Sequence, residues 1–175
     1  MKVDAVRDGI LRLYPECRVT THAEPVQELG EDFIGQFDVV LGCLDSIQAR
    51  LYVNSHAMYS GVPYVDGATH GMLGKVQVVR KGHPCLECTM NTTHVKNLEA
   101  RYSCTGREVS YFEPKVPAEI TTTSIIAAIE VREALKIVHA LWDNVLKGVL
   151  YYDGIKGTFH VLSAEISPGC PNHTG

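Results

Sequence analysis

The chain has 175 residues, 45% of them hydrophobic, which is enough to bury one substantial core, so we expect a single domain. Its 16 Lys and Arg residues and 20 Asp and Glu residues give a formal net charge of -4, which disfavours nucleic acid as a partner. No window reaches the roughly 18 apolar residues of a membrane span, and the N-terminus lacks the apolar core of a signal peptide, so we expect a cytoplasmic protein with no membrane partner.

The first third of the chain indicates a helix followed by two strands. Apolar residues recur at helical spacing from Val3 to Tyr14, and Pro15 closes that segment. We expect a short strand at Arg18–His22. The continuous apolar run Phe37–Leu44 is typical of a strand buried on both faces of a parallel sheet, so we expect it to be the central strand.

A second helix should follow the Phe37–Leu44 run directly. Asp45, with Gln48 three residues on, predicts an acidic N-cap, and Gly61 should end the helix after Ser60. A short strand is expected at residues 63–66. The glycine-bearing stretch GATHGMLG after it predicts a loop, and a further strand should run from Lys75 to Arg80.

The second half predicts one long helix and a hairpin. Apolar residues on overlapping turns of Thr121–Leu141, among them Val131, Leu135 and Val138, indicate a helix packed on the sheet. Residues 149–153 and 158–165 predict a hairpin around two glycines. The whole pattern predicts an α/β fold: a mostly parallel sheet with helices on its faces and antiparallel edge hairpins.

Two short motifs about eighty residues apart predict a metal site. Cys85-Leu-Glu-Cys88 and Cys170-Pro-Asn-His173 each offer two donors on one turn, and three sulfurs with one imidazole form an ordinary closed zinc set. Without an export signal, six cysteines are expected to be thiols or ligands instead of disulfides. The alternative is scattered thiols, with Cys85 and Cys88 as a redox pair. We expect structural zinc, because nothing helical begins at Cys85.

Asp45 is the second candidate functional residue. In an open parallel sheet, ligands bind beyond the carboxyl ends of the strands, where a carboxylate can hold magnesium on nucleotide phosphates. The alternative is that Asp45 only caps a helix.

Two further cysteines differ in their surroundings. Cys43 lies within the apolar run, so we expect a small core residue. Cys104 lies between Arg101 and Arg107, whose charges would lower its pKa and favour a nucleophilic thiolate. The alternative for Cys104 is an inert loop cysteine.

Four ordered segments together resemble the superfamily of ThiF, MoeB, HesA and the enzymes that activate ubiquitin-like proteins: FDVVLGCLDSIQARLYVN, GVPYVDGATHGMLGKVQVVRKGHPCLECT, PAEITTTSIIAAIEVREALKIV and SPGCPNH. The resemblance covers nearly the whole chain. It implies a Rossmann-like three-layer sandwich and an enzyme that adenylates the C-terminal glycine of a ubiquitin-like or sulfur-carrier protein.

The resemblance also implies roles for individual residues. Asp45 matches the aspartate that organises magnesium and ATP, and Lys2 matches a lysine that contacts the phosphates. Arg50 and Asn54 match helix positions near the nucleotide, although Arg50 also suits a structural ion pair. Cys104 falls in the region of the cysteine that accepts the activated carbonyl. The implied cofactors are therefore structural zinc, ATP and magnesium.

The sequence departs from the family pattern at its beginning. No GxGxxG phosphate turn occurs in it, and Lys2 is already the second residue. We therefore expect a truncated activating domain over residues 1–175 that binds ATP poorly and does not turn over alone. An exposed sheet edge would favour self-association, so we expect a homodimer. The alternatives are a non-catalytic zinc-stapled module or pseudoenzyme that docks a ubiquitin-like protein or a full-length partner, and, more remotely, a dinucleotide-binding oxidoreductase.

Overall fold

The computed structural model describes residues 1–90 and 119–173. It divides into two compact units, Met1–Glu31 and Asp32–Gly175, and each is described by itself. The expected residue Cys104 lies outside the described residues. Within them, no helix is both long enough and apolar enough to cross a bilayer.

The first unit contains helix α1 (Lys2–Leu13) and the short 3-10 helix η1 (Val26–Glu28). The predicted first helix is confirmed. The N-terminal amino group of Met1 donates to the carboxylate of Asp4 at 2.9 Å, and the N–H of Tyr14 donates to the carbonyl of Ile10 at the end of the last turn. The strand predicted at Arg18–His22 is wrong, because these residues adopt no regular structure. A strand needs a hydrogen-bonded neighbour, and residues 1–31 contain none.

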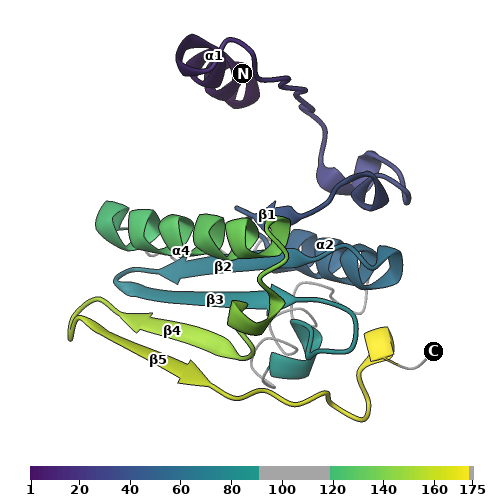
Figure 1. Ribbon diagram of the computed structural model, residues 1–175, viewed down its shortest axis with the longest axis vertical. Helices are drawn as coiled ribbons and strands as arrows, with labels where there is room; N and C mark the ends of the chain where they lie inside the picture. Colours follow the sequence, from purple (N-terminus) through teal and green to yellow (C-terminus); the bar gives the residue numbers. More distant parts are fainter. Residues whose placement is uncertain (91–118, 174–175) are drawn as a thin grey trace, which may run out of the picture. The chain divides into compact units, whose positions relative to one another are not determined.

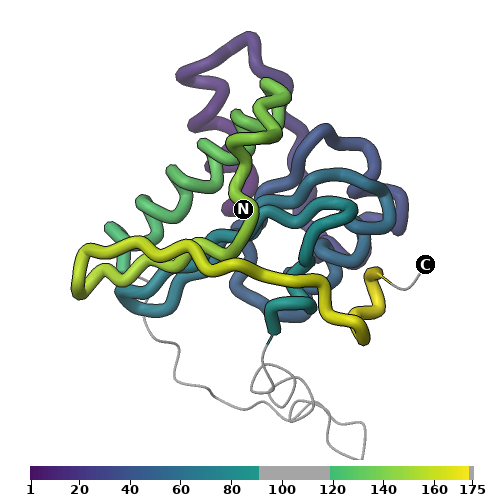
Figure 2. The backbone as a smooth tube through the Cα atoms, turned by 60° about the horizontal axis from the view of Figure 1, so that its bottom comes forward, coloured from purple at the N-terminus to yellow at the C-terminus, as the bar shows by residue number. Residues whose placement is uncertain are grey.

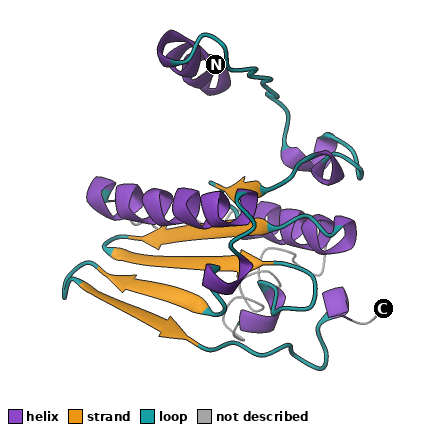
Figure 3. Cartoon of the chain, viewed as in Figure 1, coloured by secondary structure: helices purple, strands orange, loops and turns teal. Residues whose placement is uncertain are grey.

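The second unit is a five-stranded sheet in the order β1-β2-β3-β4-β5, with helices on both faces (Figures 1 and 3). Its strands are β1 (Val40–Gly42), β2 (Tyr64–His70), β3 (Leu73–Val79), β4 (Val149–Asp153) and β5 (Thr158–Leu162). Its helices are η2 (Ile34–Gln36), α2 (Ile47–Ser60), η3 (Glu87–Thr89), α4 (Ile120–Val138), η4 (Trp142–Asn144) and η5 (Pro171–His173).

The strand directions correct part of the sequence prediction. β1 and β2 are parallel, whereas the pairs from β2 to β5 are antiparallel, so the described sheet is not mostly parallel. The stretch predicted as a loop is a hairpin: His70 pairs with Leu73, and Gly71, with φ of 59°, helps to form the tight turn. The expected hairpin of β4 and β5 is confirmed.

Strand β1 is shorter and more peripheral than predicted. It spans three residues at one end of the described sheet, so the prediction of a central strand is wrong for these residues. Leu41 is 37% exposed, and Cys43 is exposed instead of being a core residue. Both results have one cause: β1 has a described neighbour on one side only.

The two long helices cover opposite faces of the sheet, which makes three layers. A Cβ added to Gly67 or Gly74 would meet Glu130 or Ile126 of α4, so those strand positions face α4. The alternate positions face α2, since Asp66 on β2 contacts Arg50 on α2. In Figure 2 the green helix α4 and the blue helix α2 are well separated.

Local capping explains where the long helices begin and end. The N-cap residue of α2 is Ser46, one position after the predicted Asp45, and its side chain accepts from the N–H of Ala49 at 3.5 Å. Gly61 ends α2 with φ of 74°, a conformation that side chains disfavour. Glu119 caps α4 by accepting from the N–H groups of Thr121 and Thr122.

The buried face of α4 differs from the predicted one. Val131, Leu135 and Val138 are 50%, 53% and 60% exposed. The buried positions are Thr122, Ile126, Glu130, Glu133, Ala134 and Ile137. A core of Val65, Val76, Val78, Ile126, Ile137 and Val145 fills the space between α4 and the sheet. The spacing of apolar residues alone therefore predicts the wrong buried face of α4, because Glu130 and Glu133 occupy buried positions.

Candidate functional site

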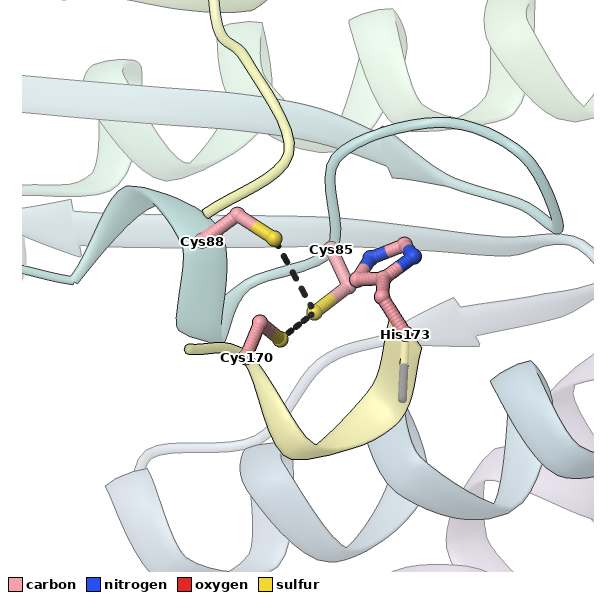
Figure 4. A group of neighbouring side chains, drawn as sticks. All are labelled: Cys85, Cys88, Cys170 and His173. Atoms are coloured by element: carbon pink, nitrogen blue, oxygen red, sulfur yellow. Dashed lines mark hydrogen bonds between the residues drawn. The ribbon is translucent and has the colours of Figure 1, made fainter. Parts of the chain in front are cut away.

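The structure brings the two cysteine motifs together. Cys85 and Cys88 come from the turn around η3, and Cys170 and His173 from the turn around η5 (Figure 4). The N–H of His173 donates to the carbonyl of Cys170 at 3.1 Å, which folds the second motif into one tight turn. The four donor atoms all lie within 4.8 Å of one another, as the sequence predicted.

The spacing of these atoms fits a metal ion. The Sγ atom of Cys85 lies 3.8 Å from that of Cys88 and 3.4 Å from that of Cys170. A tetrahedral zinc ion, with bonds to sulfur of about 2.3 Å, separates two sulfurs by about 3.8 Å. The Nε2 atom of His173 is buried and has no hydrogen-bond partner among the described residues. A buried polar atom without a partner is costly, and a metal bond would satisfy it.

The cluster favours a metal over the redox alternative. All three cysteine thiols of the cluster are free. The sulfur of Cys85 is nearer to Cys170 than to Cys88, so Cys85 and Cys88 are not an isolated pair. A dithiol redox centre requires only two thiols, whereas a closed zinc site requires four ligands such as the three thiols and one imidazole of this cluster.

The cysteines at the centre differ in their readiness to ionise. Burial raises the pKa of the Cys85 thiol, but hydrogen bonds from the backbone N–H of Cys88 and from neighbouring side chains outweigh it, so the net shift is downward. Burial raises the pKa of Cys170 to about 12. Because the thiolate is the metal-binding form, Cys85 is a readier donor than Cys170.

Hydrogen bonds tie the first cysteine motif to α2 and β3. The Oδ1 atom of Asn54 accepts from the N–H of Leu86 at 2.9 Å, and Asn54 is fully buried. The side-chain amide of Gln77 donates to the carbonyls of Pro84 at 3.2 Å and Cys85 at 3.1 Å. The cysteine–histidine cluster is therefore built into the α2 face of the sheet.

Arg50 is held by a buried carboxylate. Its Nε atom donates to Asp66 Oδ1 at 2.9 Å, and its Nη2 atom contacts Asp66 Oδ2. The hydroxyl of Tyr64 donates to the same carboxylate at 2.7 Å. Burial, followed by the field of Asp66, raises the pKa of Tyr64 above its usual value. Arg50 and Asn54 thus have structural partners, and a role for either at a nucleotide stays a prediction.

Asp45 lies where the sequence predicted a ligand-binding carboxylate. It follows the carboxyl end of β1, directly before the cap of α2. The N-cap residue of α2 is Ser46, so Asp45 lies one position before the helix cap, and its role at a nucleotide stays a prediction. Lys2 is the first residue of α1, in the other unit, and its role also stays a prediction.

The sequence analysis missed a buried carboxylate on the other face of the sheet. Glu130 is 4% exposed, and its Oε1 atom has no hydrogen-bond partner among the described residues. Burial, followed by the charge of Asp66, raises the pKa of Glu130 to about 7. The missed signal is a charged residue at helical spacing from Ile126 and Ala134, both of which are buried.

Comparison with known proteins identifies the family. The model of the ThiF family matches residues 1–172. The chain belongs to the ThiF family. Its relatives include the molybdopterin-synthase adenylyltransferase of Escherichia coli K12, which is 26% identical over 176 residues, covering 97% of this chain and 64% of that protein.

Another relative of this ThiF-family chain is SUMO-activating enzyme subunit 2 of Dictyostelium discoideum. It is 36% identical over 90 residues, which is 50% of this chain and 14% of that protein. The chain therefore spans less than two thirds of the length of these curated relatives. The fold also matches that of Escherichia coli MccB, solved with ATP, with a TM-score of 0.67 and 16% identity over 98% of this chain and 50% of that one. The expected α/β, Rossmann-like fold class is confirmed.

Proposed function

We propose that this ThiF-family chain belongs to an enzyme that adenylates the C-terminal glycine of a ubiquitin-like or sulfur-carrier protein and passes the acyl group to a cysteine. The proposal rests above all on the position of Asp45, a carboxylate directly beyond the carboxyl end of β1 and before helix α2. The names of the curated relatives, an adenylyltransferase and a SUMO-activating subunit, agree with this chemistry.

The proposed reaction has two steps. An oxygen of the carrier's terminal carboxylate attacks the α-phosphorus of ATP. The bond between the α-phosphorus and the oxygen that bridges to the β-phosphate breaks, and pyrophosphate leaves. A thiolate, proposed to be Cys104, then attacks the acyl-adenylate carbonyl, and AMP leaves. Asp45 would hold magnesium on the phosphates, and Lys2 would neutralise charge on the phosphoryl oxygens. We propose that Arg50 acts by fixing Asp66 and the start of α2.

The metal centre is proposed to hold structural zinc. Three sulfurs and one imidazole form a soft, closed donor set, which leaves no open position for a substrate. Such a site joins residues about eighty positions apart and would fix the end of the chain against α2 and β3. A reducing compartment such as the cytoplasm would keep the three thiols available to the ion.

The proposal extends to the organisation of the chain. Since the family match runs from residue 1 to residue 172, we propose that both units belong to one activating domain. Its 175 residues contain no GxGxxG phosphate turn, so we propose that the chain alone binds ATP weakly. A homodimer is also proposed, because an exposed sheet edge favours pairing with a second copy.

Exchange of labelled pyrophosphate into ATP tests the function. The chain alone should give slow exchange, whereas a fusion carrying the family's glycine-rich segment ahead of Met1 should exchange rapidly with a carrier that ends in Gly-Gly. Deleting the two glycines from the carrier should abolish the exchange. A fusion that folds, binds zinc and binds the carrier without any exchange would show a docking module instead. Micromolar affinity of the chain alone for ATP would refute the proposed weak binding.

A further inference from the structure

A basic cluster lies at the end of the sheet where β3 stops and β4 begins. We define it as Arg80, Lys81, His83 and Lys147, together with the indole of Trp142. Val149 of β4 pairs with Gln77 of β3, so the residues before β4 and after β3 leave the sheet at the same end. Lys147 and Arg80 therefore lie close to one another, although 67 positions separate them in the sequence.

A direct contact joins two members of the cluster, Arg80 and Trp142. The guanidinium carbon of Arg80 lies 5.4 Å from the centre of the Trp142 ring, within the range of a cation–π contact. His83 lies in the same turn as Arg80, and Lys147 precedes β4 at the same end of the sheet. Three permanent positive charges and one imidazole thus share a small surface beside an aromatic ring.

The positive charges of the cluster are not neutralised within the described residues. The ion pairs there engage Met1, Arg7, Arg50, Lys136 and Lys156, and none engages Arg80, Lys81 or Lys147. Asp143, next to Trp142 in the sequence, is exposed and joins none of these ion pairs. Since the chain carries a net charge of -4, this concentration of positive charge is local.

The backbone of the cluster is held in place. The N–H of His83 donates to the carbonyl of Arg80 at 3.1 Å, and Gly82 has φ of 79°, so residues 80–83 form a tight turn. Pro84 follows the turn, and Gln77 binds its carbonyl. The turn therefore joins β3 directly to the first metal-binding motif, and little backbone ordering is needed when a partner binds.

We propose that this basic cluster is a docking site for an acidic peptide segment of a partner protein, with Arg80, Lys81 and Lys147 binding carboxylates beside the exposed indole of Trp142. The site is independent of the proposed adenylation. β2 runs parallel to β1 and β3 runs antiparallel to both, so the cluster lies at the opposite end of the sheet from Asp45. A partner bound there leaves the candidate nucleotide site open.

An acidic peptide fits the cluster better than a nucleic acid does. A long nucleic acid would extend beyond the cluster and be repelled by the remaining surface of a chain with net charge -4. A short run of carboxylates can meet three cations without extending over that surface. The indole is 39% exposed and offers apolar contact to the stems of glutamate side chains.

Trp142 is the chain's one tryptophan, so its fluorescence reports on the cluster directly. We would titrate the full metal-loaded chain with acetylated, amidated hexaglutamate at low and at moderate salt. Hexaglutamate should change the fluorescence in a saturable way, and the affinity should fall as salt rises. A Lys81→Gln/Lys147→Gln variant keeps Arg80 over the indole and should bind about fivefold more weakly or worse. An Arg12→Gln/Lys156→Gln variant, with the same change in net charge, should bind as the parent does.

Three results would overturn the proposal. The first is no saturable response to hexaglutamate in a chain that retains its metal and its circular dichroism. The second is an equal loss of affinity in both double variants, which would mean that net charge alone attracts the peptide. The third is tighter binding of a single-stranded hexanucleotide than of hexaglutamate, which would assign the cluster to nucleic acid.

Discussion

The guanidinium of Arg50 on α2 binds both carboxylate oxygens of Asp66 on β2, and the side chain of Asp66 is completely buried. The contact ties the helix that follows the candidate nucleotide site to the neighbouring strand. Removing one partner leaves the other charge buried without compensation. Removing one partner is therefore expected to cost more free energy of unfolding than the attraction between the two partners contributes.

Asp66→Ala should destabilise the chain by about 3–5 kcal/mol, because it strands the guanidinium of Arg50 and removes the acceptor of Tyr64. Urea denaturation followed by circular dichroism measures this change. Lys156→Ala, which removes an exposed ion pair to Asp153, is the control and should cost less than about 1 kcal/mol. Equal effects of the two substitutions would show that the buried pair contributes no more to the free energy of unfolding than the exposed pair does.

The metal centre should hold one zinc ion per chain. Cys85→Ser should abolish metal retention and lower the melting temperature, since Cys85 lies at the centre of the cluster. Elemental analysis after gel filtration measures the metal, and cobalt substitution should give thiolate charge-transfer bands. Cys17→Ser changes an exposed cysteine that is not one of the four candidate ligands and should retain the metal. A metal-free wild-type chain with unchanged stability in a chelator would contradict the assignment.

Glu130 should make stability depend on pH. Its pKa is raised from 4.5 to about 7 by burial and by Asp66, so the folded chain holds a proton that the unfolded chain releases. This contribution is fully present below about pH 4.5 and is lost as the pH rises through about 7. Glu130→Gln should remove the dependence and be more stable than the parent at pH 8 by about 1–2 kcal/mol.

The difference between the two chains is the quantity to measure, because other groups titrate in both. Urea denaturation at pH 5, 6, 7 and 8 gives the free energy of unfolding of the parent and of Glu130→Gln. The free energy of unfolding of Glu130→Gln, minus that of the parent, should increase steadily as the pH rises. A constant difference would mean that Glu130 is ionised in the folded chain throughout this range.

Asp45 and Ser46 can be separated by mutation, because the structure assigns the cap of α2 to Ser46. Ser46→Ala should cost about 1 kcal/mol of stability and leave pyrophosphate exchange by the fusion nearly unchanged. Asp45→Asn should leave stability nearly unchanged and reduce exchange by about a hundredfold or more. The reverse pattern, with Asp45→Asn costing stability and sparing exchange, would return Asp45 to the role of a helix cap.

The sequence predicted the elements whose signals are local. The spacing of apolar residues and Pro15 predicted α1, Gly61 marked the end of α2, and the two glycines predicted the β4–β5 hairpin. The GATHGMLG stretch was predicted as a loop because glycine signals a turn equally in a loop and in a hairpin. Only the pairing of β2 with β3 distinguishes the two, and pairing depends on both strands.

By itself, the sequence determined the four candidate metal ligands, since Cys85, Cys88, Cys170 and His173 form two pairs of donor residues, each three positions apart. The tertiary structure alone decided that Arg50 binds Asp66, that Glu130 is buried, and that Arg80 lies over the ring of Trp142. The reason is physical. Short-range spacing fixes which side chains share a turn, whereas the partner of a charged side chain depends on which distant elements pack against it and exclude water.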